Sequence, residues 1–217
     1  MMGEERHQLA AANFARNNSR TLQAVNILRT RYNRLTGVRN VVKNDGVSED
    51  EFLDSVNFLA EEGYIRLRRM ADRIPSTLAD SDYRELEAKL TGKGIRQRAG
   101  AVEDELVEEE IGARSALRAG NFIESNAQVL LALNILAHQY HRLADIQGLQ
   151  MGRGVSESEF LDSVNFLAEE GYIRLRQIST GETAELADSD YRTLEGLLTG
   201  KGKRLLCGNI RDELIGV

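Results

Sequence analysis

The sequence predicts an α+β protein, mainly helical, built as two tandem domains that each combine a small helical core with a β-hairpin. The first observation is a duplication: residues 46–68 recur, with one substitution, as residues 154–176. The second is that apolar residues in each copy first follow a helical spacing and then alternate. The period of 108 residues is far longer than that of solenoid repeats, so each copy can hold its own core. We place the domains at residues 1–108 and 109–217.

The first predicted helix covers residues 18–35 of copy one and the matching residues of copy two. Apolar residues recur there on one helical face: Leu22, Val25, Leu28, Tyr32 and Leu35, then Leu130, Leu133, Leu136, Tyr140 and Leu143. The stretch that follows, residues 36–45, has little periodicity. It predicts either a short strand or a degenerate helix.

The second helix begins after Ser48, because Ser48 with Glu51 forms the pattern of a capping box. Gly63 stands where a left-handed residue would end this helix. Residues 64–68 then alternate, with Ile65 and Leu67 facing inward and the arginines facing outward, as expected of a half-buried strand.

A second, antiparallel strand is predicted around residues 86–90, where Leu86, Ala88 and Leu90 alternate. Thr91 caps a short last helix that Gly100 ends. The next stretch, residues 101–117, lacks a Pro/Gly/Ser-rich linker and predicts a helical joint between the copies.

Composition limits the function classes. The chain has no apolar run long enough to span a bilayer, and its charged N-terminus lacks the apolar core of a signal peptide. With Cys207 as the single cysteine, these features predict a cytoplasmic protein without membrane contact. Copy one holds 17 basic and 18 acidic residues, and copy two holds 11 and 16. Neither copy is strongly basic, which weighs against nucleic-acid binding.

The order helix, weak element, helix, strand, loop, strand, short helix resembles the winged-helix family. The resemblance depends on residues 48–65, which end in Glu-Glu-Gly-Tyr-Ile, and on residues 90–96, Leu-Thr-Gly-Lys-Gly-Ile-Arg, both present in copy two. It implies tandem winged-helix domains, in which the helix before Gly63 is the recognition helix and the hairpin is the wing. It also implies DNA binding and transcription regulation.

The implied recognition helix carries carboxylates where DNA reading needs Arg, Lys, Asn or Gln. A polyanion would repel such a face. The face therefore reads either as a solvated acidic surface or as a docking surface for a basic protein partner. The candidate protein-interaction residues are Glu49, Glu51, Asp54, Glu157, Glu159 and Asp162.

Positive charge gathers instead on the predicted wing and last helix, where it could follow phosphates. The candidate nucleic-acid-binding residues are Arg66, Arg68, Arg69, Arg73, Lys93, Arg96, Arg98, Arg174, Arg176, Lys201, Lys203 and Arg204. The competing interpretation is that Arg66 and Arg68 pair with Glu61, Glu62 or Glu87 on neighbouring elements.

Other chemistry is not indicated. His138 and His141 would share a helical face but lack a third metal ligand. The spacing around Lys93 is not that of a phosphate loop, and Asp80 with Asp82 reads as a turn. No nucleophile and base stand together. We therefore expect a non-enzymatic protein without a cofactor or a metal.

Two functions remain open. In the first, the two domains form an internal pseudo-dimer that binds double-stranded DNA through its basic wings. In the second, the protein is an adaptor that docks a basic protein through its acidic helices and binds no DNA. The small size and the few motifs would suit a phage or mobile-element gene.

Overall fold

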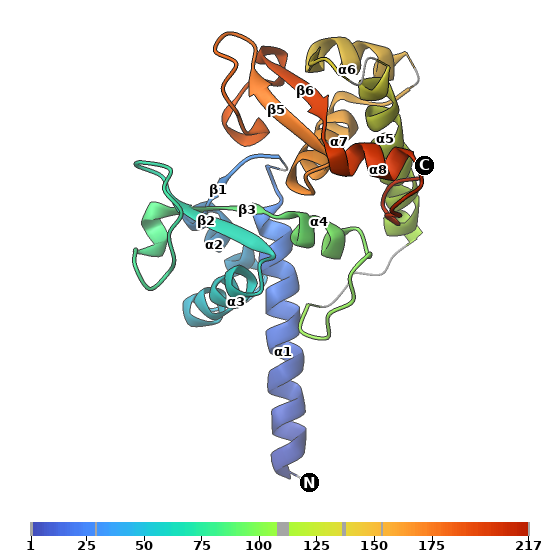
Figure 1. The fold of residues 1–217 in the computed structure, drawn as a ribbon. Helices are drawn as coiled ribbons and strands as arrows, with labels where there is room; N and C mark the ends of the chain where they lie inside the picture. The colour runs from blue at the N-terminus through green and yellow to red at the C-terminus, as the bar shows by residue number, and fades with distance from the viewer. Residues whose placement is uncertain (1, 29, 108–112, 136–137, 153, 217) are drawn as a thin grey trace. The chain divides into compact units, whose positions relative to one another are not determined.

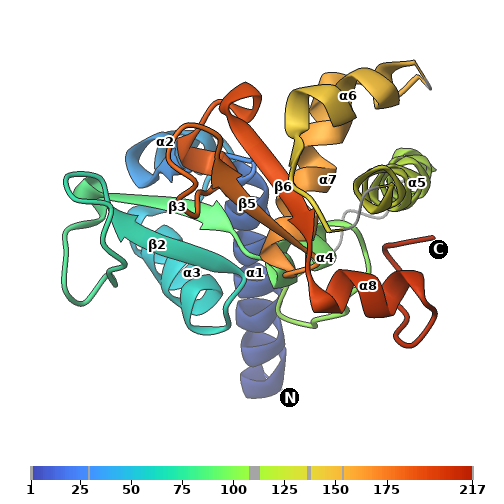
Figure 2. The same ribbon diagram turned by 45° about the horizontal axis from the view of Figure 1, so that its top comes forward.

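The computed structural model describes residues 2–28, 30–107, 113–135, 138–152 and 154–216. The chain divides into two compact units, Met1–Ile111 and Gly112–Val217. Each unit has helices and one small antiparallel sheet, so the protein belongs to the α+β class. Figures 1 and 2 show the units in two views, and each is described by itself below.

The elements of the two units follow one another in the same order. Unit 1 contains α1 (Met2–Val25), β1 (Asn33–Arg34), α2 (Leu35–Asn44), α3 (Glu49–Glu61), β2 (Ile65–Arg69), β3 (Leu86–Leu90) and α4 (Gly92–Arg98). Unit 2 contains α5 (Ala113–Asn134), β4 (His141–Arg142), α6 (Leu143–Met151), α7 (Glu157–Glu169), β5 (Ile173–Gln177), β6 (Leu194–Leu198) and α8 (Gly200–Leu206). One 3₁₀ turn, Tyr83–Glu85, precedes β3, and two, Leu186–Asp188 and Tyr191–Thr193, precede β6.

Each sheet has three strands, one more than the hairpin that the sequence predicts. The order is β1-β3-β2 in unit 1 and β4-β6-β5 in unit 2, and all pairs are antiparallel. In unit 1, Ala88 of β3 lies between Asn33 of β1 and Leu67 of β2. The predicted hairpin is therefore confirmed, and the two-residue edge strand was missed.

The first helix differs from its prediction, because α1 ends at Val25 and does not reach residue 35. The buried side chain of Asn33 donates a hydrogen bond to the Val25 carbonyl at 2.7 Å and accepts one from the Leu28 amide. These bonds replace the ones a further helical turn would make. Leu28 and Tyr32 consequently lie outside the helix, and Leu28 is 58% exposed.

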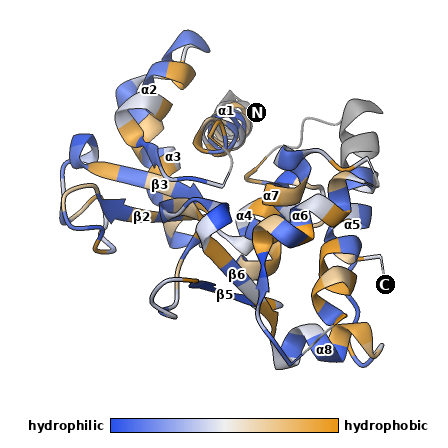
Figure 3. Ribbon diagram, turned by 90° about the horizontal axis from the view of Figure 1, so that it is seen from above, coloured by the Kyte–Doolittle hydropathy of each residue, from blue (hydrophilic) through white to orange (hydrophobic). Residues whose placement is uncertain are grey.

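The weakly periodic stretch of unit 1 is the helix α2, not a strand. Leu35, Val38 and Val42 form its buried face. They join the core of the unit, where α1 packs against α2 and α3. In Figure 3 hydrophilic and hydrophobic colours alternate along α2, as expected of a helix with one buried face.

The caps of α3 are confirmed. The Ser48 hydroxyl accepts a hydrogen bond from the Glu51 amide, and the Glu51 carboxylate accepts one from the Ser48 amide at 2.8 Å. Gly63 follows with a φ of 71°, a left-handed conformation that costs little in glycine. The Tyr64 amide then bonds to the Leu59 carbonyl, which turns the chain into β2.

The repeated Thr-Gly-Lys-Gly sequence after each sheet has a structural role. Thr91 caps α4, and its hydroxyl donates to the Gly63 carbonyl at 2.5 Å. The Thr91 amide donates to the Tyr64 carbonyl at 3.0 Å. Gly94 lies so close to that carbonyl that an added β-carbon would collide with it. The motif thus joins the end of α3 to the start of α4.

The predicted helical joint is wrong for residues 101–107, which form irregular chain, bends and a turn. The predicted helix between residues 113 and 117 is present as the start of α5, and residues 108–112 lie outside the described part. The region 101–107 instead folds back onto its own unit, as described below.

Replacing Gly94 or Gly202 with alanine should destabilise its own unit by about 1–3 kcal/mol, because a backbone carbonyl cannot move aside as a side chain can. Gly37 and Gly148 are matched controls, since they lie in α2 and α6 with nothing within 4 Å of an added β-carbon. Their alanine variants should be neutral or stabilising. Thermal unfolding measures the difference, and equal effects at all positions would contradict this reading.

Candidate interaction surfaces

Two of the candidate arginines, Arg68 and Arg176, form ion pairs and aromatic contacts within their own units. Arg68 donates to Glu87 at 2.7 Å, and its guanidinium lies 3.5 Å from the centre of the Tyr32 ring. Arg176 repeats both contacts, with Glu195 at 2.6 Å and the Tyr140 ring at 3.6 Å. The arginine therefore sits between a carboxylate and an aromatic face in both units, an arrangement that stabilises the sheet.

Two candidate lysines are engaged in the same way. Lys93 donates to the Glu62 carbonyl at 2.8 Å and lies 4.0 Å from the centre of the Tyr64 ring. Lys201 donates to the Glu170 carbonyl at 2.6 Å and lies 4.2 Å from the Tyr172 ring. A cation at the C-terminal end of a helix is favourable. Both lysines thus hold the end of the acidic helix.

The wing of unit 1 begins with a tight turn. Arg69 pairs with Asp72 at 2.6 Å, and both side chains are exposed. Arg73 follows with a φ of 61°, which side chains rarely adopt. Unit 2 has Gly181 at the matching position, with a φ of 71°. The first wing therefore keeps an arginine where the backbone favours glycine.

The other candidate cations differ in exposure. Arg66, Arg96 and Arg98 are half-buried, whereas Arg174, Lys203 and Arg204 are exposed. Residues 65–90 hold six basic and five acidic residues, and residues 173–198 hold three and five. The first wing is thus nearly neutral and the second is acidic.

Four arginines outside the set of candidate nucleic-acid-binding residues belong to the same surfaces. Arg34 and Arg142 stand on the short edge strands, in register with Glu87 and Glu195. Arg84 pairs with Asp82 and Glu49, and Arg192 pairs with Asp190 and Glu157. Their recurrence at the repeat spacing was the signal that could have identified them.

The acidic face of α3 is exposed. Glu49, Asp50, Asp54, Glu61 and Glu62 all lie on the surface, and the helix contains no Lys or Arg. In α7, Glu157 is exposed, whereas Glu159 and Asp162 are half-buried. The predicted docking residues are thus outward-facing in α3 and only partly so in α7.

Glu51 and Glu159 have a second role, because both close a capping box. The hydrogen bonds from the Ser48 hydroxyl and amide hold the pKa of Glu51 below its ordinary value of 4.5. This carboxylate therefore acts first as a cap. The candidate docking face of α3 is better represented by Asp50, Asp54 and Glu61.

The remaining sequence motifs act in turns. Asp82 accepts a hydrogen bond from the Arg84 amide and caps the 3₁₀ turn before β3, and Asp190 does the same before β6. The helical face expected for His138 and His141 does not exist, because α5 ends at Asn134 and His141 begins β4. Among the described residues, no group of three His, Cys, Asp or Glu side chains could hold a metal ion.

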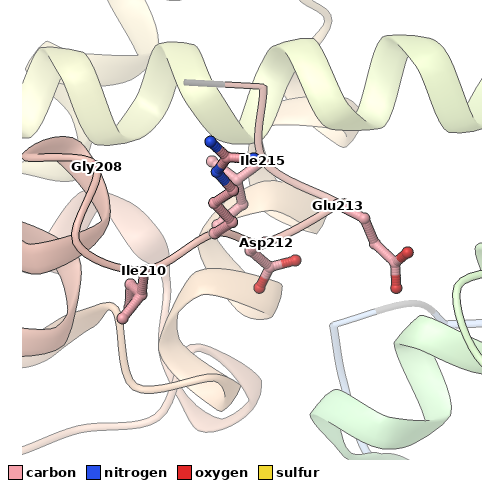
Figure 4. A pocket seen from close by; sticks show the side chains of 6 residues that line it. Gly208, Ile210, Asp212, Glu213 and Ile215 are labelled. Atoms are coloured by element: carbon pink, nitrogen blue, oxygen red, sulfur yellow. The ribbon is translucent and has the colours of Figure 1, made fainter.

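One open pocket lies along the last segment of unit 2 (Figure 4). Its lining mixes a cation, two carboxylates and two isoleucines: Gly208, Ile210, Arg211, Asp212, Glu213 and Ile215. These residues come from one short segment and do not bring together a nucleophile and a base. The pocket is a groove beside that segment.

No known protein family, curated protein or solved structure matches the chain. Within the described residues, none of the helices combines the length and the apolar character needed to cross a bilayer.

Ser48→Ala and Ser156→Ala each remove a cap hydroxyl and should lower the stability of the unit that contains it by about 1 kcal/mol. The two losses should be similar because the cap geometry is the same in both units. Thermal unfolding measures them.

Folding lowers the pKa of Glu51, so the stability that this carboxylate contributes is complete above the ordinary pKa of 4.5 and is lost as the pH falls through the pKa of the folded state. Urea unfolding of wild type and Glu51→Gln between neutral and acid pH should show a smaller acid loss in the variant. Parallel curves would contradict this assignment.

Proposed function

We propose that the protein is a non-enzymatic, cytoplasmic interaction protein built from two winged-helix-like modules, and that the acidic face of α3 docks a basic protein partner. Three helices followed by a hairpin, with a short third strand after the first helix, support the winged-helix assignment. The assignment concerns architecture, and the function depends on the surfaces.

The character of α3 argues against groove binding. A helix that enters the major groove must approach phosphates, and exposed carboxylates raise the energy of that approach. Asp50, Asp54 and Glu61 face solvent in α3 without a basic residue in the helix to offset them. A basic protein surface would instead gain from the same charges.

The observation that carries the proposal is the internal use of the wing cations. Arg68, Lys93 and their counterparts Arg176 and Lys201 are each held by a carboxylate or carbonyl and by an aromatic ring. Contact with phosphates would have to compete with these bonds. The same cations therefore support the fold in both units, whereas Asp50, Asp54 and Glu61 of α3 are exposed to solvent.

The direct test is the triple charge reversal Asp50→Lys, Asp54→Lys, Glu61→Lys. A labelled oligoarginine peptide serves as the basic probe, and its affinity should fall at least about tenfold at low salt. The matched control reverses the exposed Glu105, Glu182 and Glu213, which changes the net charge equally. Equal loss in both triple variants would show that only net charge matters and would refute an α3 docking face.

A second candidate function is DNA contact through the first wing. The observation that favours it is Arg73, an exposed arginine at a φ of 61° where unit 2 has glycine. Backbone strain of this kind is often retained where a side chain has a function. Such a contact would concern unit 1, because the second wing is acidic.

The substitution Arg73→Gly tests this second function, because it should have opposite effects on the stability of unit 1 and on its affinity for DNA. The change should stabilise unit 1 by up to about 1 kcal/mol, because glycine adopts a positive φ without strain. If the first wing contacts phosphates, the same variant should bind a labelled DNA duplex more weakly and with a shallower salt dependence. Unchanged binding, or no binding by the wild type at low salt, would exclude this second function.

A further inference from the structure

Each unit ends in a short closing segment that folds back onto its own core. The closing segments are residues 103–107, Glu-Asp-Glu-Leu-Val, and residues 211–215, Arg-Asp-Glu-Leu-Ile. Asp104 accepts hydrogen bonds from the Tyr64 hydroxyl at 2.5 Å and from the Leu106 amide at 2.8 Å. Asp212 accepts the same two bonds, from Tyr172 at 2.6 Å and from Leu214 at 3.0 Å.

A buried asparagine holds the other side of each closing segment. Asn18 of α1 donates to the Leu106 carbonyl at 2.8 Å, and Asn126 of α5 donates to the Leu214 carbonyl at 2.8 Å. Both asparagines are fully buried. A buried amide without its partner would be costly, so these donors require a carbonyl at that position.

The last residue of each closing segment is aliphatic and buried. Val107 is 2% exposed and Ile215 is 4% exposed. The groove therefore contacts an aspartate, the backbone two residues later, and an aliphatic side chain three residues after the aspartate. Figure 4 shows the side chains of Asp212, Glu213 and Ile215 along this segment of unit 2.

Of the positions between these contacts, the glutamate is exposed in both units, whereas the leucine is 37% exposed at Leu106 and 3% exposed at Leu214. Glu103 and its counterpart Arg211 are both exposed and have opposite charges, and Glu105 and Glu213 are exposed as well. The two closing segments thus share Asp-Glu-Leu followed by an aliphatic residue, and they differ in the charge of the residue before the aspartate. The contacts that hold both segments are those of the aspartate, the leucine carbonyl and the aliphatic side chain.

We propose that the groove beside Asn126 and Tyr172 in unit 2, and its counterpart in unit 1, is a recognition site for segments of the form Asp-x-Leu-aliphatic, which the closing segment occupies until a partner polypeptide supplies its own. The ligand is an acidic segment of another protein that forms the same turn, in which the Val107 amide bonds to the Asp104 carbonyl and the Ile215 amide bonds to the Asp212 carbonyl. Its aspartate replaces Asp212 at the tyrosine hydroxyl, and its aliphatic residue replaces Ile215.

The chemistry of the site suits a carboxylate ligand. Burial and the Asp104 hydrogen bond raise the pKa of Tyr64 well above its ordinary value. The hydroxyl therefore stays protonated and donates a charge-assisted hydrogen bond to the aspartate. Because the closing segment is tethered, it competes at a high effective concentration, and a partner must exceed that competition.

The test uses the full chain with Asp212→Ala and Ile215→Ser, which removes the two anchors of the closing segment and leaves Asn126 and Tyr172 intact. The probe is a labelled synthetic peptide with the sequence of residues 209–217, measured by fluorescence anisotropy. The variant should bind the peptide at least about tenfold more tightly than wild type, where the closing segment competes. A peptide with Asn in place of Asp212 should bind about tenfold more weakly.

The outcomes are distinct. Equal affinity of wild type and variant would place the peptide elsewhere on the surface and overturn the proposal. So would equal affinity for the two peptides, or no binding by a variant whose circular dichroism spectrum is that of a folded chain.

A second experiment applies if that variant does not fold. The double substitution Arg211→Glu with Ile215→Val gives the closing segment of unit 2 the sequence found in unit 1. It should leave the unfolding temperature of unit 2 nearly unchanged. Asp212→Asn, a single change of similar size, should lower that temperature. If the double substitution lowers the unfolding temperature as much as Asp212→Asn does, the groove depends on every residue of the segment and the proposed recognition pattern is wrong.

Discussion

Each unit depends on one buried tyrosine, Tyr64 in the first and Tyr172 in the second. The Tyr64 amide donates a hydrogen bond to the Leu59 carbonyl at the end of α3, and the Tyr64 carbonyl accepts one from the Thr91 amide. Its ring lies beside the Lys93 ammonium, and its hydroxyl holds Asp104. Tyr172 repeats these contacts with Leu167, Thr199, Lys201 and Asp212. A single residue therefore links the acidic helix, the last helix and the closing segment, and any change that moves it should disturb all three.

The parts predicted from the sequence are those whose signals are local. Ser48, Gly63 and Thr91 end or begin elements through contacts with near neighbours, so α3, the hairpin and α4 could be placed. The end of α1 could not, because it depends on a side-chain bond from Asn33 to Val25 that periodicity does not show. The sequence predicts helix for the closing segment of unit 1, because Glu and Leu favour helices. Its structure is set by contacts made 40 and 88 residues away in sequence.

The candidate surfaces divide in the same way. The cations and carboxylates could be identified by residue type, and the pairing of Arg68 with Glu87 was among the interpretations considered. The stacking of Arg68 on Tyr32 could not be foreseen, because Tyr32 had been assigned to a helical face. These internal contacts make phosphate binding by the wing less favourable than docking through α3. A wing whose charges are already matched is a weak phosphate ligand, whereas the exposed carboxylates of α3 have no such compensation within the helix.

Each unit closes its own core with its own closing segment, so damage to one closing segment should stay within its unit. Hydrogen exchange measured by mass spectrometry on wild type and Asp212→Asn detects such damage segment by segment. We expect faster exchange only in peptides of residues 112–217, including β5, β6 and α8, and unchanged protection in α3, β2 and β3 of unit 1. Equal acceleration in both units, or none in either, would contradict it.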